Sequence, residues 1–285
     1  MASVAPSITL GDYEITLIRD GAYWWDGGAV FGVVPKTLWS RRHPSDDLNR
    51  IPLAFNCFVI RTGERTILIE TGGGDKMDPR ARERMKLAPE PSRLPEVLAA
   101  AGIDPESIDT VVNTHLHWDH CSGNTVLTHA GVIPAFPRAR YFAPRGEWEH
   151  AHERHVRDAV SYIDANYDPL LESGRMTLVE DGHEVAPGVS MRRAPGHNRD
   201  MTVVTAQSAG RTFCFLGDLV PFAVHLQPTW VPAFDLFPLQ TIETRMEWLR
   251  RAAEGSWLVG FGHDCEVDFA RVRTDEKSKF AHAPA

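Results

Sequence analysis

The stretch Thr114-His115-Leu116-His117-Trp118-Asp119-His120 places three histidines and one aspartate within six residues. It follows the apolar run Thr110-Val111-Val112-Asn113, which is typical of a buried strand. Imidazole and carboxylate groups are the ligands that zinc and similar divalent metals prefer. A lone histidine is usually structural, but four ligand-type side chains at this density indicate a metal site. The stretch therefore predicts a metal site at the end of a strand.

Further ligand-type side chains follow three other predicted strands. His197 follows 191–194 through a Pro-Gly turn, Asp218 follows 212–216, and His263 follows 257–261. Ligands in open α/β sheets bind beyond the carboxyl ends of strands, where loops converge, so we expect all these side chains to meet. The predicted metal ligands are His115, His117, Asp119, His120, His197, Asp218 and His263.

The number of donors favours two ions over one. A catalytic zinc uses three protein ligands and keeps one position open. Seven donors exceed that requirement and suit two ions that share one carboxylate. In two-metal sites with ions about 3.5–4 Å apart, a bridging water ionises near neutral pH and becomes the nucleophile. The sequence thus predicts two divalent ions, with zinc first and manganese, iron or cobalt as alternatives.

Composition bounds the class of protein. The chain has 285 residues, of which 43% are hydrophobic and 24% charged, which is typical of a globular protein with a sizeable core. The formal net charge of −8 argues against a nucleic-acid partner. The first residues lack the features of a secretory signal, and no apolar run is long enough to span a membrane. We expect a cytoplasmic protein without a membrane partner, and a homodimer stays open.

Hydrophobic periodicity predicts the elements of a single domain over 1–285. Predicted strands cover 7–20 as a pair, 54–60 and 66–70 as a hairpin, 109–113, 176–206 in succession, 212–216 and 257–261. Predicted helices cover 93–102, the region from 144 to 163, and 240–253 with Ile242, Met246, Leu249 and Ala253 on the inner face. We predict a long aromatic loop over 21–52 and a disordered tail over 277–285. The histidines at 150, 152 and 155 are expected on a solvated helix face.

The ordered motif His115-x-His117-x-Asp119-His120, His197, Asp218 and His263 resembles the metallo-β-lactamase-fold hydrolase superfamily over about 54–265. The resemblance implies an α+β fold, an αββα sandwich in which two mixed sheets face each other, with helices outside and a binuclear site at one edge. It further implies that His115, His117 and His197 hold the first ion and that Asp119, His120 and His263 hold the second. Asp218 would bridge both ions, and Asp119 would also hand a proton to the leaving group.

One residue departs from the family pattern. Glu70, before Thr71-Gly72, stands where the family usually has an aspartate that supports the metal ligands from behind. Glutamate is one methylene longer, so we expect either an adjusted turn or an altered metal affinity. Cys121 and Cys265 each lie within two residues of a predicted ligand, and for both the sequence favours packing over metal contact.

The family covers many substrates, so the fold alone does not fix the reaction. The runs 136–141 (FPRARY), 145–149 (RGEWE), 217–221 (GDLVP) and 232–235 (PAFD) resemble the N-acyl-homoserine-lactonase and methyl-parathion-hydrolase-like branches. This resemblance favours a di-zinc hydrolase of lactones or related esters that uses a metal-bridging hydroxide. The alternatives are a phosphotriesterase or arylesterase, and a non-catalytic metal- or ligand-binding protein in which Glu70 marks a decayed site.

Aromatic residues gather in two segments that the motif does not use. Trp24, Trp25, Phe222, Trp230 and Phe234 would suit an apolar or aromatic small-molecule substrate, and core packing is the equal alternative. His225 lies in the second of these segments and is a candidate catalytic oxyanion donor, although a lone histidine is more often structural.

Overall fold

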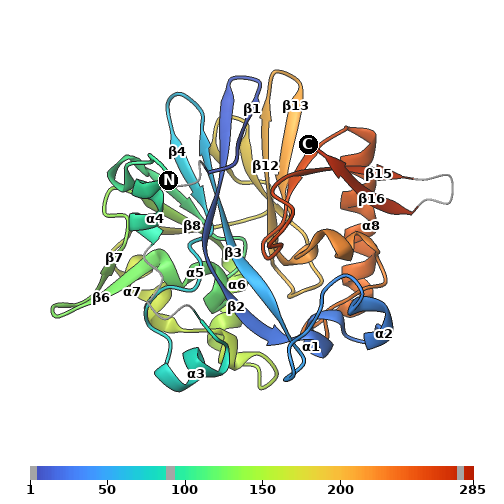
Figure 1. The fold of residues 1–285 in the computed structure, drawn as a ribbon. Helices are drawn as coiled ribbons and strands as arrows, with labels where there is room; N and C mark the ends of the chain where they lie inside the picture. Colours follow the sequence, from blue (N-terminus) through green and yellow to red (C-terminus); the bar gives the residue numbers. More distant parts are fainter. Residues whose placement is uncertain (1–4, 88–93, 275–278) are drawn as a thin grey trace.

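The computed structural model describes residues 5–87, 94–274 and 279–285. Two seven-stranded sheets lie face to face, and helices cover their outer sides (Figure 1). This is the α+β arrangement that the family resemblance implied. A separate two-stranded hairpin, β6 (Thr125–Thr128) and β7 (Gly131–Pro134), projects from one side (Figure 1). No helix of the described residues is long and apolar enough to cross a membrane.

The first sheet has the order β1-β2-β3-β4-β5-β8-β9. Its strands are β1 (Ser7–Leu10), β2 (Tyr13–Asp26), β3 (Arg50–Arg61), β4 (Thr66–Ile69), β5 (Thr110–Val112), β8 (Arg140–Pro144) and β9 (Met176–Val179). The pairs from β1 to β4 are antiparallel, whereas β4, β5, β8 and β9 run parallel. The carboxyl ends of these parallel strands therefore open at one edge, where the loop after β5 begins.

The second sheet has the order β10-β11-β12-β13-β14-β15-β16. Its strands are β10 (Glu184–Ala186), β11 (Val189–Arg193), β12 (Thr202–Ser208), β13 (Arg211–Phe215), β14 (Leu258–Gly260), β15 (Ala270–Thr274) and β16 (Phe280–Pro284). β13 and β14 are paired in parallel, and the other neighbours are antiparallel. The parallel pair delivers the loops after β13 and β14 to the same edge.

The helices bury one face each. α4 (Leu94–Ala100), α6 (Arg145–Glu153) and α7 (Asp168–Glu172) cover the first sheet, and α8 (Pro238–Glu254) covers the second (Figure 1). The remaining short helices are α1 (Gly27–Phe31), α2 (Lys36–Trp39), α3 (Pro79–Arg84) and α5 (Trp118–Cys121). In β3, Phe58 and Ile60 face the core between the sheets, while Cys57 and Val59 face the outer core. Burial on both faces explains why this strand reads as a continuous apolar run.

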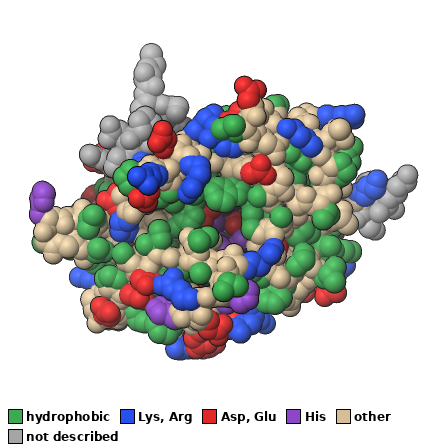
Figure 2. All heavy atoms as spheres, turned by 90° about the horizontal axis from the view of Figure 1, so that it is seen from below, with side chains coloured by type: hydrophobic (Ala, Val, Ile, Leu, Met, Phe, Trp, Pro, Cys, Tyr) green, Lys and Arg blue, Asp and Glu red, His purple; other side chains and the backbone are tan. Residues whose placement is uncertain are grey.

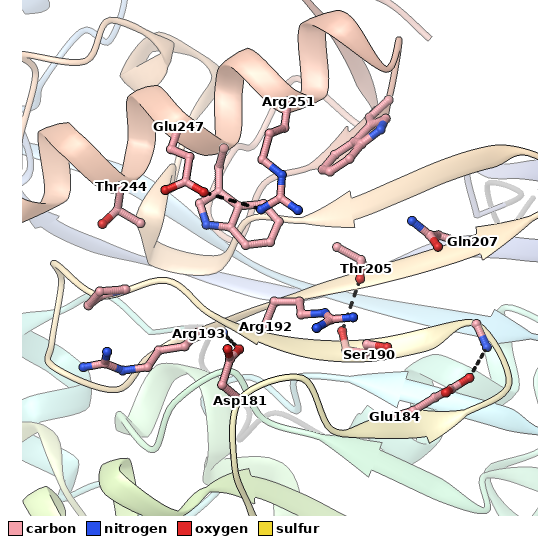
Figure 3. Close-up of a pocket in the computed structure, with 14 residues that line it drawn as sticks. Asp181, Glu184, Ser190, Arg192, Arg193, Thr205, Gln207, Thr244, Glu247 and Arg251 are labelled. Atoms are coloured by element: carbon pink, nitrogen blue, oxygen red, sulfur yellow. Dashed lines mark hydrogen bonds and ion pairs between the residues drawn. The ribbon is translucent and has the colours of Figure 1, made fainter.

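The helical cover of the second sheet is incomplete. Between α8 and the outer face of β11 and β12 lies a groove of about 610 Å³, lined mainly by polar side chains (Figure 3). Ser190 and Arg192 of β11 point into it, while Val189 and Met191 of the same strand are buried between the sheets. This alternation is that of a strand with one solvated face.

The predicted loop over 21–52 is wrong at both ends, because β2 covers its first residues and β3 covers its last three. β2 continues through Asp26 and pairs with β3, so that Trp25 lies opposite Ile51, and α1 and α2 occupy part of the remainder. The register shifts between Arg19 and Ala22, where Gly21 has φ of 91°. A glycine there permits the bulge and lets the strand resume. The bulge interrupts the alternation of apolar and polar residues, so the sequence does not show that 13–26 form one strand.

Two helix predictions also need correction. The helix from 144 ends at Glu153, Val156 and Val160 are exposed, and His150 is buried against Asp158 at 2.8 Å rather than solvated. The inner face of α8 carries Thr241, Thr244, Arg245, Trp248, Leu249 and Ala252, whereas Met246 is 39% exposed. The buried Arg245 guanidinium donates to the carbonyl oxygens of Leu219 and Trp230. Apolar periodicity places Met246 on the inner face of α8, but the structure has the charged Arg245 there instead.

The predicted disordered tail is wrong for residues 280–284, while 277 and 278 lie outside the described residues. These five residues form β16, which pairs with β15 from Ala270↔Pro284 to Thr274↔Phe280. Phe280 is 4% exposed and packs in the core beneath α8. Phe280 is the one large apolar side chain of this strand, whose other residues are two alanines, a histidine and a proline. A single large apolar residue gives too weak a pattern to predict a strand from the sequence. The strand over 257–261 is accordingly not the last one.

Candidate metal centre

The seven predicted ligands converge at the edge of the sandwich where β5, β13 and β14 end. His117 has an extended backbone, with φ of −64° and ψ of 149°, and α5 begins at the next residue. His115 and His117 therefore leave an extended segment, while Asp119 and His120 project from a helical turn. Figure 2 views this end of the molecule and shows a hollow with acidic and histidine side chains inside and hydrophobic side chains around it.

His115, His117 and His197 form one group of donors. All three are buried, and one ligand atom from each lies within 4.8 Å of the others. Nε2 of His197 is 3.0 Å from Nδ1 of His117. Nε2 of His115 and Nε2 of His117 are buried and have no hydrogen-bond partner in the described structure. Such orphaned nitrogens are costly unless something binds them.

Asp119, His120 and His263 form the second group, with ligand atoms again within 4.8 Å of one another. Nε2 of His263 lies 3.2 Å from Nε2 of His120, and 3.7 Å from Oδ2 of Asp119. When each ring is neutral with its proton on Nδ1, both Nε2 atoms present lone pairs and cannot hydrogen-bond to each other. A cation held near both lone pairs would satisfy them.

The carboxylate of Asp218 lies between the two groups. Its Oδ2 is 3.4 Å from Nε2 of His197 and 3.9 Å from Nε2 of His115. Its Oδ1 is 3.1 Å from Nε2 of His263 and 3.4 Å from Nε2 of His120. One oxygen thus faces each group, which is the arrangement a shared ligand requires. Imidazole and carboxylate donors of this number and burial fit two divalent cations.

Groups behind the histidines hold the ring nitrogens that face away from the cluster. Nδ1 of His263 is 2.9 Å from the carbonyl oxygen of Ala54, and Nδ1 of His197 is 3.0 Å from Oδ1 of Asp235. Asp235 is itself buried and accepts a 2.7 Å hydrogen bond from Thr241. Such partners fix the tautomer and the ring orientation of a ligand. In the sequence, Asp235 stood out only within a family-like run, and nothing local linked it to His197.

Glu70 supports the cluster through an adjusted turn. It is 2% exposed and has φ of 60°, a left-handed conformation that is unusual for glutamate. Oε1 accepts hydrogen bonds from the backbone and hydroxyl of Thr114 and lies 3.5 Å from Nδ1 of His120. The longer side chain thus still reaches His120, one of the predicted metal ligands. Of the two expectations for Glu70, the geometry fits the adjusted turn.

Four histidines of the cluster fall into two pairs by the direction in which their pKa is shifted. Burial lowers the pKa of His115 and of His117 well below the usual value. Burial opposes the proton on His197 too, but Asp218 and Asp235 outweigh it and raise the pKa to about 9. The pKa of His120 is raised in the same way as that of His197. Burial lowers it, but the charges of Asp218 and Asp119 outweigh burial and raise it well above the usual value. Protons and divalent cations therefore compete for the same nitrogens.

Four of the five predicted pocket aromatics lie on the cluster side. The ring of Phe222 is 6.3 Å from that of His263, and Phe234 meets His197 edge-on at 5.8 Å. Trp25 and Trp230 pack against the aromatic core around these rings. Trp24 lies on the opposite face of β2 from Tyr23 and Trp25, where the Lys86 ammonium sits 4.5 Å from its ring. The structure therefore separates Trp24 from the other four.

His225 does not suit the predicted oxyanion role. It is fully buried and stacks on Phe31, and its Nε2 lies 3.2 Å from the carbonyl oxygen of Val30. Burial and the nearby Arg245 hold the pKa of His225 well below its usual value, so the ring is neutral. A neutral ring that donates its Nε2 proton to Val30 has no proton for an oxyanion. This corrects the assignment of His225 as catalytic.

Neither cysteine near the cluster belongs to a donor group of the described residues. The thiol of Cys121 is fully buried and lies 3.3 Å from the carbonyl oxygen of Leu116, to which it donates. The sulfur of Cys265 is 3.9 Å from the carbonyl oxygen of its neighbour His263. Both positions agree with packing.

Tyr23 is the site residue that the sequence reasoning missed. Its hydroxyl lies 2.6 Å from Oδ2 of Asp119. The residue belonged to the predicted aromatic loop, and no spacing rule connects β2 to the loop after β5. Pairing of β2 with β3, which runs beside the loop of His263, brings it there.

Known proteins share sequence similarity with this chain. Residues 50–263 match the model of the metallo-beta-lactamase superfamily. The N-acyl homoserine lactonase AiiA of Bacillus thuringiensis subsp. kurstaki is 25% identical over 238 residues, which cover 74% of this chain and 82% of that protein. The N-acyl homoserine lactonase AiiB of Agrobacterium fabrum is 25% identical over 270 residues, 86% of this chain and 92% of the relative.

Solved structures with the same fold include a probable metal-dependent hydrolase from Staphylococcus aureus, with a TM-score of 0.88 and 29% identity over 98% of this chain and 99% of that one. AidC, a dizinc quorum-quenching lactonase with a bound product, has a TM-score of 0.79 at 19% identity over 99% of this chain and 97% of its own. Together with the buried histidine and aspartate groups, the match to the superfamily model supports a metal-dependent hydrolase that binds divalent ions. The chain belongs to the metallo-beta-lactamase superfamily.

Proposed function

We propose that this protein is a binuclear metal-dependent hydrolase that opens lactones or related esters, with zinc as its metal. The observation that carries the proposal is the carboxylate of Asp218, which presents one oxygen to each of two three-residue donor groups. The lactone preference is supported by curated relatives named N-acyl homoserine lactonases, which align over most of the chain.

In this proposal His115, His117 and His197 hold one ion, Asp119, His120 and His263 hold the other, and Asp218 contacts both. When bound, a pair of divalent ions supplies Lewis acidity and activates water at neutral pH. No serine or cysteine nucleophile is needed.

The chain itself supplies proton transfer and exclusion of water. The side chain of Asp119 is 12% exposed, more than the 6% of Asp218, so it can hold a proton and pass it to the departing alkoxide. Phe222 and Phe234 flank the ligand histidines and keep bulk water from the reacting ester. The apolar rim around the hollow suits an acyl chain or an aromatic group (Figure 2).

A substrate panel on the zinc-loaded protein tests the proposal. The panel holds an N-acyl homoserine lactone, a simple aryl ester, a phosphotriester such as paraoxon, and a β-lactam. We expect the lactone to give the highest kcat/KM. Turnover of the phosphotriester or aryl ester without lactone opening would assign the alternative hydrolase function, and bound metal without any turnover would refute an enzymatic role.

A further inference from the structure

The carboxylate of Asp119 is held from outside the family core. The Tyr23 hydroxyl lies 2.6 Å from Oδ2 of Asp119, and Tyr23 is 4% exposed. Tyr23 belongs to β2, before the residues 50–263 that match the superfamily model. Within the described part of the chain, this hydroxyl is the group that hydrogen-bonds to that carboxylate. The predicted ligand histidines, by contrast, are held by groups within 50–263.

The phenol ring is fixed on several sides. It stacks on Phe55 with ring centres 5.0 Å apart and meets Trp118 edge-on at 5.1 Å and His263 at 5.9 Å. The backbone of Ala54, next to Phe55, donates to the carbonyl oxygen of His263 at 3.0 Å. The strand pair that carries Tyr23 is therefore tied to the loop that carries a metal ligand, so the hydroxyl has a defined position relative to the cluster.

The direction of the hydrogen bond is also fixed. A phenol carries one O–H donor, whereas an ionised carboxylate has acceptor oxygens only. The carboxylate oxygen must then be the acceptor. A hydrogen bond to a charged acceptor in a buried site is among the stronger ones in proteins.

Both oxygens of the Asp119 carboxylate face histidines of the second donor group, which requires one particular rotation of the carboxylate. Its Oδ1 is 3.9 Å from Nε2 of His120, and its Oδ2 is 3.7 Å from Nε2 of His263. Rotation about the Cβ–Cγ bond would move both oxygens away from these nitrogens. An aspartate at the start of a four-residue helix has little else to prevent that rotation.

We propose that Tyr23 is a positioning residue for the second metal position: by donating to Oδ2, it holds the Asp119 carboxylate in the orientation that faces His120 and His263. This inference rests on the binuclear centre of the proposed function. The N-terminal strand pair is thereby part of the metal site, and its bulge at Gly21 sets where the phenol lies.

The test compares Tyr23→Phe with the matched control Tyr13→Phe. Both variants lose one hydroxyl, but that of Tyr13 donates to the carbonyl oxygen of Pro187 in the turn between β10 and β11. Metal-free protein is titrated with Co²⁺, and visible absorption reports the first and second equivalents. We expect Tyr23→Phe to bind the first ion normally and the second about 10- to 100-fold more weakly, as for other partners behind metal ligands. Tyr13→Phe should match the wild type.

A double-variant comparison shows whether Tyr23 acts through Asp119. In an Asp119→Asn background, adding Tyr23→Phe should leave the weakened second-ion affinity unchanged. An unchanged second equivalent in Tyr23→Phe would overturn the inference, as would an equal loss in the Asp119→Asn background, because a general loosening of the fold would give that result. The cobalt readout needs no turnover, so failure of the lactonase proposal in the substrate panel is separate from failure here.

Discussion

Oδ1 of Asp235 lies 3.0 Å from Nδ1 of His197, and both side chains are at most 2% exposed. The second oxygen of Asp235 accepts the Thr241 hydroxyl of α8 at 2.7 Å. Hydrogen bonds therefore connect α8 through Asp235 to the ring of His197, a predicted metal ligand, and turn its Nε2 towards the cluster. Partners of this kind orient ligands and raise their basicity.

Asp235→Asn tests that chain of contacts, because it keeps the shape of the side chain and removes its charge. We expect zinc affinity at the first position to fall about 10- to 100-fold, measured by calorimetry against a competing chelator. Asp268→Asn is the control, since Asp268 pairs with Arg19 at the surface, and it should bind zinc as the wild type does. Wild-type affinity in Asp235→Asn would show that His197 needs no such support.

Glu70→Asp restores the residue that the family usually has and shortens the side chain by one methylene. Because the turn at φ of 60° places the glutamate carboxylate 3.5 Å from Nδ1 of His120, the shorter side chain should withdraw from that ring. We expect the second ion to bind about tenfold more weakly, as titration with Co²⁺ would show. Tighter binding in Glu70→Asp would mean that this turn is not adapted to glutamate.

Zinc affinity should rise with pH. Asp218 and Asp235 raise the pKa of buried His197 to about 9 in the metal-free protein, whereas an unfolded histidine titrates near 6.5. This proton stabilises the metal-free fold below about pH 6.5 and is lost as the pH rises through about 9. Zinc requires neutral rings, so loss of the His197 proton alone should increase affinity about tenfold per pH unit from about 7 to 9, and the raised pKa of His120 should make the rise steeper. Chelator competition and proton release measure this, and a flat profile would contradict it.

The C-terminal strand should contribute to stability. Phe280 of β16 is 4% exposed in the core beneath α8, so Phe280→Ala should cost about 3 kcal/mol of the free energy of unfolding. His282 of the same strand is exposed, and His282→Ala should change the free energy by less than about 0.5 kcal/mol. Urea unfolding followed by circular dichroism compares the two, and equal effects would mean that β16 does not anchor through Phe280.

The donor set was readable from the sequence because each donor follows a strand within a few residues. His115 to His120 lie together in the chain, and His197, Asp218 and His263 each follow a glycine-containing turn or a glycine. Local spacing is enough for that inference, since strand ends collect at one edge of a sheet. The resemblance then supplied the sandwich fold, which the sheet order matches.

The supporting residues were not readable in this way, because they meet the cluster only through tertiary packing. Tyr23 reaches Asp119 across 96 positions of sequence, and Asp235 reaches His197 across 38. The inner face of α8 was misread because a buried arginine can replace an apolar residue when carbonyl oxygens surround it. His225 was misread because its stacking partner Phe31 lies on a distant helix.

The proposed lactone hydrolysis depends on two ions in one donor cluster. Its most direct test is to titrate metal-free protein with zinc while following the opening of an N-acyl homoserine lactone. We predict that activity rises until two equivalents are bound, and that His117→Ala stays folded but inactive. Full activity without zinc or in His117→Ala, or two bound zinc ions without any lactone opening, would contradict the claim.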